Sequence, residues 1–216
     1  MVKAAIFDLD GTIANTLADL TTAINATRKY YGLDEVDEEF ILKFVNGDTV
    51  TFILACIPDI PKDEIENGVA VYKRTYSKCY LEKTKPYDGI KESLEELKKS
   101  GIKLAVFSNK SDEYVKMMAD ELFGGIFDIT LGSGIFPSKP APDGALDILD
   151  RFGVSSDEAV YIGDSDVDIN TAKNANIKAV GVSWGYRGRE FLENLGGCAV
   201  VDTPDEMAAI IKCGGF

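Results

Sequence analysis

The sequence predicts an α/β fold with a Rossmann-like parallel sheet core and a helical domain inserted near its start. Two observations predict this class. From residue 90 onward, short apolar runs alternate with helical patterns, which is typical of a parallel sheet with helices on both faces. From residue 14 to residue 84, apolar residues recur only at helical spacing. We therefore expect an α/β core formed by residues 1–13 and 85–216, and a helical domain formed by residues 14–84.

The first strand is expected at Ala4–Phe7, an unbroken apolar run of strand length. The inserted segment that follows carries helical patterns separated by turn residues. In the first of them, Leu17, Leu20 and Ile24 recur at helical spacing. The helices expected in this segment cover residues 17–30, 37–45, 49–57 and 62–82.

The second part of the core is expected to alternate between helix and strand. Its helices are expected at residues 90–99, 112–122, 142–152, 166–175 and 205–212. Its strands are expected at residues 102–107, 127–131, 159–162, 179–182 and 199–201. In parallel sheets of this kind, ligands bind beyond the carboxyl ends of the strands. The residues that directly follow each strand are therefore the candidates for function.

Two acids directly follow the first strand. The spacing of Asp8 and Asp10 points both side chains to the same side of an extended backbone. Two carboxylates this close are costly unless a cation lies between them or one of them holds a proton. Metal-assisted chemistry supplies the first condition, and acid/base chemistry supplies the second. A calcium loop is excluded, because its required Gly and Glu positions hold Ile13 and Asp19. A structural turn is the alternative, and Thr12 adds a hydroxyl to the same stretch.

Polar side chains are also expected at two later positions along the carboxyl edge. Ser108 and Asn109 follow the strand at 102–107, at the expected start of a helix, where backbone N–H groups suit a phosphate. Ordinary helix capping is the alternative. Lys139 lies between two prolines, and a long cation on a stiff loop suits an anionic group that gains charge in a transition state. The alternative is a solvated lysine.

An acidic cluster follows the strand at 159–162. Asp164, Asp166 and Asp168 lie within five residues. A calcium loop that starts at Asp164 is excluded, because residues 169 and 175 are neither Gly nor Glu. We expect Asp166 to cap the following helix. Asp164 and Asp168 then complete a hard-cation site that begins at the first strand, and magnesium fits that small set of carboxylates.

The composition excludes several kinds of chemistry. The chain has no histidine, which excludes Ser-His-Asp catalysis, Cys-His catalysis and histidine-bound zinc. Its four cysteines form no C-x-x-C pair and are expected to be reduced thiols. The net charge of −13 argues against nucleic acid and anionic membranes as partners. No apolar run approaches the roughly 20 residues that cross a bilayer, and no signal-peptide pattern is present, so a cytoplasmic location is expected.

Taken together and in this order, the motifs resemble the haloacid dehalogenase superfamily of aspartate-nucleophile phosphatases. The matching blocks are Asp8-Leu-Asp10-Gly-Thr12, Ser108-Asn109, Lys139-Pro140 and Gly163-Asp164-Ser165-Asp166-Val167-Asp168. The resemblance extends over essentially the whole chain. The helical segment at 14–84 is similar to the smaller cap type of this superfamily. Ser183-Trp184-Gly185-Tyr186 resembles its phosphoglycolate phosphatase branch, which also includes pyrophosphatases, although Asn15 stands where that branch often has an acid.

The resemblance implies roles for the residues that would contact the substrate. Asp8 would attack phosphorus and become an aspartyl phosphate. Asp10 would protonate the leaving oxygen and then activate the water that hydrolyses the intermediate. Ser108, Asn109 and Lys139 would hold the phosphoryl oxygens. With no histidine in the chain, a carboxylate pair is the natural way to supply both nucleophile and acid/base.

The resemblance also implies a magnesium site. The Mg²⁺ ligands would be the carboxylates of Asp8 and Asp164 together with the backbone carbonyl of Asp10. Thr12 and Asp168 would support the site without binding the metal themselves. Dehalogenases of the superfamily lack the second acid and use no metal, so the presence of Asp10 favours phosphate chemistry.

The expected function is therefore a Mg²⁺-dependent phosphatase that hydrolyses a small phosphomonoester metabolite of the phosphoglycolate type. A phosphosugar mutase or a pyrophosphatase of the same superfamily is an alternative. A receiver-like phospho-acceptor is the alternative outside enzymes, because receivers also combine acids, a hydroxyl and a lysine in a parallel sheet. Receivers are much shorter than 216 residues and lack a helical insert, which argues against that alternative.

Overall fold

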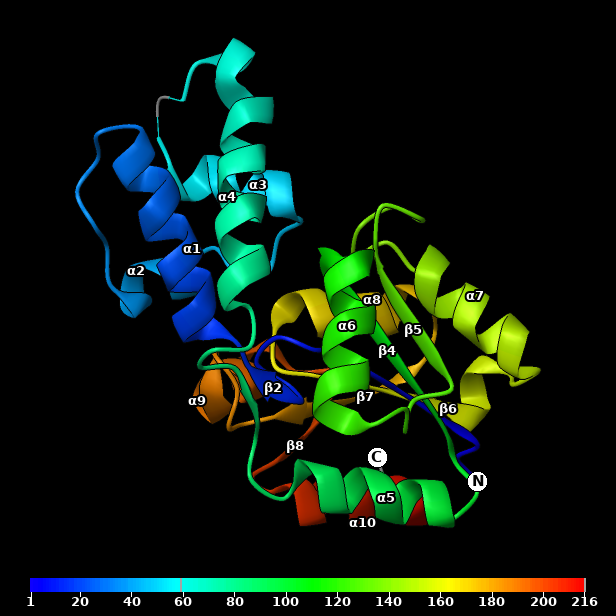
Figure 1. Cartoon of the computed structure of the whole chain (residues 1–216). Helices are drawn as coiled ribbons and strands as arrows, with labels where there is room; N and C mark the ends of the chain where they lie inside the picture. The colour runs from blue at the N-terminus through cyan, green and yellow to red at the C-terminus, as the bar shows by residue number, and fades with distance from the viewer. Residues whose placement is uncertain (59, 216) are drawn as a thin grey trace. The chain divides into compact units, whose positions relative to one another are not determined.

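A computed structural model describes residues 1–58 and 60–215. The chain divides into two compact units, shown in Figure 1. The first, which we call the core unit, comprises Met1–Ala14 and Pro86–Phe216. The second, the helical unit, comprises Asn15–Lys85. The chain crosses between the units at β2 (Ala14–Asn15) and β3 (Lys85–Pro86), which form a two-stranded sheet.

Within the described residues, six parallel strands form the sheet of the core unit. Their order is β5-β4-β1-β6-β7-β8, with the first strand of the sequence in the interior. The strands are β1 (Ala4–Phe7), β4 (Lys103–Ser111), β5 (Ile129–Ser133), β6 (Ala159–Gly163), β7 (Lys178–Val182) and β8 (Ala199–Val201). The four apolar residues of β1 are fully buried, as expected for a strand covered on both faces. The predicted fold class is confirmed.

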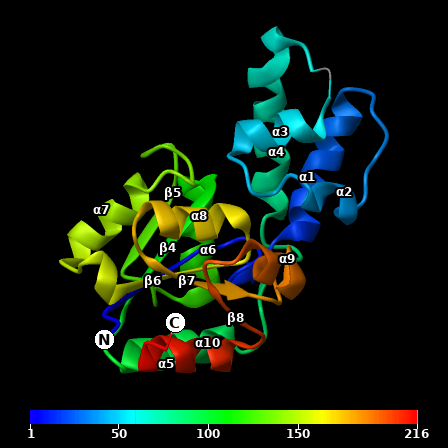
Figure 2. The same ribbon diagram turned by 180° about the vertical axis from the view of Figure 1, so that it is seen from behind.

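Helices cover both faces of this sheet (Figures 1 and 2). The helices of the core unit are α5 (Ile90–Lys99), α6 (Asp112–Phe123), α7 (Asp143–Phe152), α8 (Asp166–Asn174), α9 (Gly188–Leu195) and α10 (Pro204–Cys213). The apolar side chains of α7 and α8 pack in one buried cluster with Ala4 and Ile6 of β1. Helices α5 and α10 lie side by side beneath the opposite face. Helices cover both faces of the sheet, so its carboxyl edge is left for a ligand. The loops after β1 and β6 meet at this edge, because the two strands are parallel neighbours.

Three local expectations for the core unit were wrong. The strand expected to end at residue 107 continues as β4 to Ser111, with an irregular register after Phe107. Helix α9 was not expected, although Phe191, Leu192 and Leu195 recur at helical spacing, because the segment is only eight residues long and ends at Gly196. The strand expected at 127–131 begins two residues later, at Ile129.

The helical unit is formed by α1 (Leu17–Tyr30), α2 (Glu38–Leu42), α3 (Thr49–Cys56) and α4 (Ile65–Cys79), with a short 3₁₀ turn at Lys62–Glu64. Helix α1 packs along α4. Helix α2 is shorter than the expected 37–45 segment, and residues 43–46 form turns instead. Across residues 1–58 and 60–215, every helix is too short or too polar to span a bilayer.

A buried acid ties the two ends of the helical unit together, and its loss is expected to be costly. Asp19 on α1 is fully buried. Its carboxylate accepts hydrogen bonds from the backbone N–H groups of Lys83 and Thr84 and from the Thr84 hydroxyl, at 3.0, 2.8 and 2.8 Å. Asp19→Ala leaves these donors without their acceptor, so we expect a loss of about 3 kcal/mol in the free energy of unfolding. Urea titration measures this loss.

Asp48→Ala is the matched control for Asp19→Ala. Asp48 also accepts backbone N–H groups, from Val50 and Thr51, but at an exposed helix start where water replaces the lost acceptor. We expect Asp48→Ala to cost about 1 kcal/mol. Equal losses in free energy of unfolding in the two variants would show that the burial of Asp19 does not make its hydrogen bonds more stabilising than those of Asp48.

Candidate active site

The two acids after β1 lie at the carboxyl edge of the sheet. The backbone N–H of Asp8 donates to the carbonyl of Ile162 on β6 at 2.9 Å, which continues the strand ladder to the first acid. The chain then turns at Gly11, whose φ of +84° suits a residue without a Cβ atom. Asp8 is 7% exposed, so its carboxylate is charged only at a cost unless cations lie beside it.

Lys139 reaches into this buried site and joins two of its acids. Its ammonium group donates to Asp8 Oδ1 and to Asp168 Oδ1, each at 2.7 Å. The lysine is 6% exposed, so it is not the solvated lysine of the alternative interpretation. The pKa of Lys139 is raised well above its usual value, because the Asp168 and Asp8 charges outweigh the cost of burial. Lys139 is therefore a fixed positive charge beside Asp8 and Asp168.

Asn109 holds the backbone of Lys139. Its side-chain oxygen accepts from the Lys139 N–H at 2.8 Å, and its amide nitrogen donates to the Lys139 carbonyl at 3.1 Å. Both backbone groups of the lysine are thus fixed from β4. This arrangement explains how a surface loop delivers a buried cation to the site.

Ser108 and Asn109 do not start a helix, as the sequence had led us to expect. Both lie within β4, and α6 begins only at Asp112 with Ser111 as its N-cap. The capping alternative is wrong for the same reason. The Ser108 hydroxyl is buried and accepts from the N–H of Lys110 at 3.3 Å. The side chains of Ser108 and Asn109 therefore enter the site from a strand end.

The acids after β6 lie beside Asp8. Asp164 is fully buried, and its carboxylate accepts from the Thr12 hydroxyl at 3.2 Å and from the Tyr186 N–H at 2.7 Å. Asp168 is also fully buried and accepts from the Ser165 hydroxyl at 2.6 Å. Ser165, and not the expected Asp166, caps α8, because Ser165 and Asp168 form a reciprocal capping box.

Carboxylate oxygens of Asp8, Asp164 and Asp168 lie within 4.8 Å of one another. Burial, with the charges of Asp168 and Asp10, raises the pKa of Asp8 to about 7 although Lys139 opposes the shift. Burial, with the charges of Asp168 and Asp8, also raises the pKa of Asp164 well above its usual value. Crowded buried acids with raised pKa values are the condition that a bound cation relieves.

This donor set fits a divalent metal. The site holds four carboxylates, including that of Asp10, and two lysine ammonium groups, which leaves two negative charges if all are ionised. All the side-chain donors are oxygens, as magnesium prefers. Both oxygens of Asp168 and both of Asp164 accept hydrogen bonds, while one Asp8 oxygen accepts from Lys139. Carboxylate oxygens of all three acids lie close enough together to share one cation. The Asp10 side chain lies outside the cluster of three acids.

Lys110 and the segment 184–186 are site residues that sequence reasoning missed. The ammonium group of Lys110 donates to both carboxylate oxygens of Asp10, at 2.9 and 3.0 Å. Trp184 donates its indole N–H to the carbonyl of Thr12 at 3.0 Å. Lys110 could have been proposed as a site residue from the sequence, because it directly follows Ser108-Asn109. The strand had been expected to end at residue 107 and the next helix to begin at residue 112, so residue 110 was expected in neither element.

Gly185 is expected to be essential for the acid cluster. A Cβ atom at this residue would lie 2.2 Å from the Cβ atom of Asp164 and 2.5 Å from the carbonyl oxygen of Gly11. Both neighbours belong to the site, so Gly185→Ala must displace one of the two loops. We expect kcat/KM for the reaction at this site to fall at least about 100-fold, because displacements of about 1 Å are this costly in active sites.

Gly215→Ala is the matched control, because a Cβ atom there would meet nothing closer than 3.6 Å. We expect its activity to stay within twofold of the unmodified chain, a difference that steady-state kinetics resolves. Full activity in Gly185→Ala would show that the 184–186 segment does not fix the position of Asp164.

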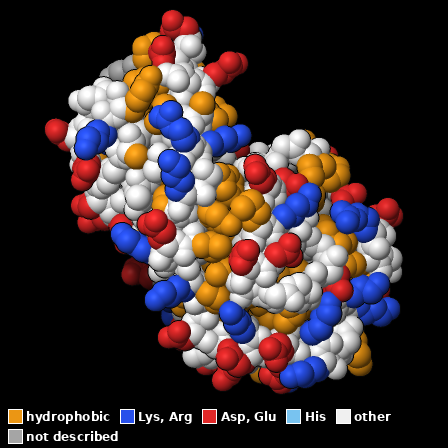
Figure 3. All heavy atoms as spheres, in the orientation of Figure 1, with side chains coloured by type: hydrophobic (Ala, Val, Ile, Leu, Met, Phe, Trp, Pro, Cys, Tyr) orange, Lys and Arg blue, Asp and Glu red, His pale blue; other side chains and the backbone are white. Residues whose placement is uncertain are grey.

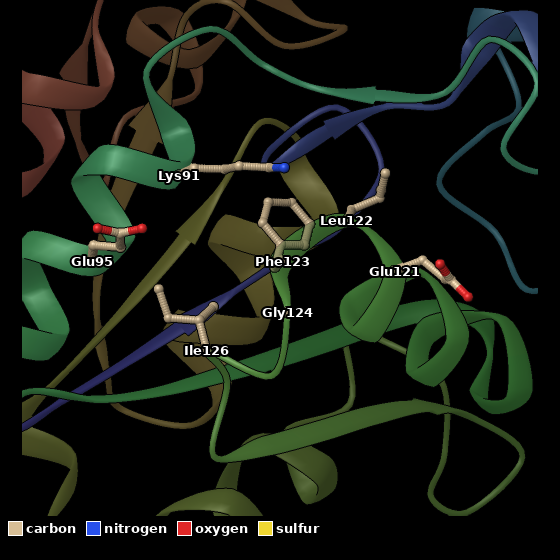
Figure 4. A pocket seen from close by; sticks show the side chains of 7 residues that line it. All are labelled: Lys91, Glu95, Glu121, Leu122, Phe123, Gly124 and Ile126. Carbon is tan, nitrogen blue, oxygen red and sulfur yellow. The ribbon is translucent and has the colours of Figure 1, made fainter.

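Two cavities of the core unit lie away from these acids. One, of about 290 Å³, is lined by Lys91 and Glu95 of α5 and by Phe123 and Ile126 (Figure 4). The other, of about 710 Å³, lies near the end of α8 and the glycines at 196–197. Neither is lined by an acid or lysine of the cluster. We therefore take the cluster of charged side chains at the carboxyl edge, and not either cavity, as the candidate active site.

Comparison with known proteins decides the family. The model of the haloacid dehalogenase-like hydrolase family matches residues 5–182, which include every acid and lysine described above. The chain is a haloacid dehalogenase-like hydrolase. The resemblance inferred from the four sequence blocks is confirmed.

The relatives of this hydrolase are phosphatases. A phosphoglycolate phosphatase from Aquifex aeolicus is 35% identical over 86% of both chains. One from Colwellia psychrerythraea is 30% identical over 97% of both chains. The crystal structure of a candidate phosphoglycolate phosphatase from Lactobacillus delbrueckii subsp. bulgaricus is 36% identical with a TM-score of 0.89, and covers 97% of this chain and 98% of its own. This hydrolase is therefore a phosphoric monoester hydrolase, similar to phosphoglycolate phosphatases.

Proposed function

We propose that this hydrolase is a Mg²⁺-dependent phosphatase that cleaves a small phosphomonoester of the phosphoglycolate type through an aspartyl phosphate on Asp8. One observation carries the proposal. Asp8 and Asp10 share one loop, yet Asp8 pairs with Lys139 in the acid cluster and Asp10 pairs with Lys110 outside it. Two carboxylates in different surroundings are suited to two different tasks.

The first half-reaction transfers the phosphoryl group to Asp8. An Asp8 oxygen forms a bond to phosphorus while the bond from phosphorus to the alcohol oxygen breaks. Asp10 donates its proton to that leaving oxygen. Lys139, held by Asn109, and the Ser108 hydroxyl bind the phosphoryl oxygens, whose charge they stabilise in the transition state.

The second half-reaction returns Asp8 to its starting state. Asp10, now a carboxylate, takes a proton from water as the water oxygen bonds to phosphorus. The bond between phosphorus and Asp8 breaks, which releases inorganic phosphate. Asp10 therefore ends the cycle protonated and ready for the next substrate, with acid and base roles in one residue.

The residues that would hold the metal are Asp8 and Asp164, with the backbone carbonyl of Asp10 implied by the family resemblance. Magnesium, when bound, supplies positive charge that offsets the crowded carboxylates and the incoming phosphate. Thr12 and the Tyr186 N–H orient Asp164 through their hydrogen bonds. Asp168 orients Lys139 and does not need to bind the metal.

The helical unit is proposed to act as a cap that selects the leaving group. Its support is the connectivity, because Asn15–Lys85 is inserted into the core unit by only two crossings. Replacement of residues 16–84 by a short linker should spare hydrolysis of 4-nitrophenyl phosphate at least about 10-fold more than hydrolysis of 2-phosphoglycolate. Equal losses on both substrates would instead assign catalytic groups to the helical unit.

A phosphate-release assay with Mg²⁺ and a panel of phosphomonoesters tests the proposed function. The panel contains 2-phosphoglycolate, glucose 1-phosphate, pyrophosphate and 4-nitrophenyl phosphate. We expect many turnovers, with the highest kcat/KM on 2-phosphoglycolate. Isomerisation of the glucose phosphate without phosphate release would favour a mutase, preference for pyrophosphate would favour a pyrophosphatase, and one slow turnover would favour a receiver-like acceptor.

A further inference from the structure

Lys110 is a second buried cation of the site, separate from the acid cluster. Its side chain is 6% exposed and the side chain of its partner Asp10 is 11% exposed. Two hydrogen bonds, of 2.9 and 3.0 Å, join the ammonium group to the two carboxylate oxygens of Asp10. Lys139 instead contacts Asp8 and Asp168. The two lysines therefore pair with different acids of the site.

The position of Lys110 relative to Asp10 places its charge beside the leaving group. Under the proposed function, Asp10 lies within hydrogen-bond distance of the leaving oxygen. An ammonium group bonded to the same carboxylate then lies within about 6 Å of that oxygen. In phosphoglycolate, one carbon separates the leaving oxygen from a carboxylate. That carboxylate can therefore approach an ammonium group that lies within about 6 Å of the leaving oxygen. An ammonium group is a compact charge with rotatable donors, so its charge also attracts a second anion nearby.

The rest of the charge distribution makes this lysine important. The chain has a net charge of −13, which repels a small anionic substrate. On the face of the core unit shown in Figure 3, Lys and Arg side chains are interspersed with acidic ones. Water screens a buried ammonium group less than an exposed one, and Asp10 does not offset the charge of Lys110 when it holds the proton that the proposed first half-reaction requires.

We propose that Lys110 selects phosphomonoesters whose alcohol carries an anionic group next to the ester oxygen, by binding that group. This inference rests on the proposed function and adds to it the residue that recognises the leaving group. Lys139 binds the phosphoryl group that every phosphomonoester shares. Lys110 binds the part that distinguishes one substrate from another.

The test compares two substrates of equal carbon number in one variant. Lys110→Met keeps an unbranched side chain only one atom shorter than lysine and removes its charge. 2-Phosphoglycolate carries the adjacent carboxylate, and ethyl phosphate lacks it while keeping an alkyl leaving group that also needs protonation by Asp10. We expect kcat/KM of Lys110→Met to fall about 10- to 100-fold more on 2-phosphoglycolate than on ethyl phosphate, chiefly through KM. Lys110→Arg, which keeps the charge, should restore part of the preference.

Lys116→Met is the matched control, because Lys116 is an exposed lysine on α6 whose ammonium group pairs with Asp112. Its substrate preference should equal that of the unmodified chain. Inhibition of 4-nitrophenyl phosphate hydrolysis by glycolate gives a second measurement. The inhibition constant should rise in Lys110→Met and not in Lys116→Met. A folding defect would lower the amount of active enzyme and leave this constant unchanged.

The outcomes separate this inference from the proposed function. An unmodified enzyme that prefers ethyl phosphate to 2-phosphoglycolate overturns the substrate class. An unmodified enzyme that prefers 2-phosphoglycolate, with the same preference in Lys110→Met, overturns the role of Lys110 alone. Equal losses on both substrates would mean that Lys110 only orients Asp10.

Discussion

Asp8→Asn is expected to abolish phosphate release from every phosphomonoester, with kcat at least about 10⁴-fold below that of the unmodified chain. The amide is nearly the same size as the carboxylate but is a very weak nucleophile. Asp8 is buried at the centre of the site, where Lys139 and the cluster acids converge. A steady-state assay with 2-phosphoglycolate and 4-nitrophenyl phosphate measures the loss on substrates with poor and good leaving groups.

Two observations distinguish this loss from misfolding. Asp8→Asn removes one charge from a buried acid cluster that has an excess of negative charge, so the thermal midpoint without metal should not fall. Asp120→Asn makes the same change at an exposed position on α6 and should keep full activity. Residual activity in Asp8→Asn near that of Asp120→Asn would assign the nucleophile to another residue.

Removal of the metal has the second largest expected effect. Excess chelator should lower kcat at least about 10³-fold, and added Mg²⁺ should restore it. The acid cluster then carries uncompensated negative charge against the phosphate dianion. Calcium should bind without supporting turnover, because its larger and looser coordination shell displaces Asp8 from in-line attack.

Thermal unfolding gives a reading of metal binding that is independent of turnover. A ligand that binds only the folded state raises the melting temperature, and the increase grows with the logarithm of the ligand concentration above its Kd. Mg²⁺ should therefore raise the melting temperature of the unmodified chain but not that of Asp164→Asn, which loses a proposed ligand. Full activity in excess chelator, with no effect of Mg²⁺ on melting, would remove the metal from the account.

The sequence predicted those parts of the fold that depend on local pattern. The buried strand Ala4–Phe7 and the later alternation of strand and helix were recognisable, because unbroken apolar runs mark strands covered on both faces. The extension of β4 to Ser111 was not recognisable, since Ser108, Asn109 and Lys110 are polar and lack strand propensity. Their extended conformation comes from tertiary contacts.

In the candidate site, too, the residues that follow a local sequence pattern could be predicted, and the contacts between distant residues could not. Asp8, Asp164 and Asp168 could be proposed from their positions after strands, and they do lie together. The pairing of Asp10 with Lys110 joins residues 100 positions apart, and no local pattern indicates it. The capping of α8 by Ser165 instead of Asp166 was missed because both residue types are good N-caps. Only the geometry of the turn separates the two.

The nucleophile assignment of Asp8 is tested most directly by trapping the covalent intermediate in Asp10→Asn. This variant keeps the nucleophile but lacks the base that activates water, a role worth about 10²–10⁴-fold. With 4-nitrophenyl phosphate, whose leaving group needs little protonation, the account predicts a phosphoryl adduct after an acid quench. Intact-protein mass spectrometry should show it in Asp10→Asn and not in the double variant with Asp8→Asn, and peptide mapping should locate it on Asp8. An adduct on Ser108, or one that persists in the double variant, would contradict the account.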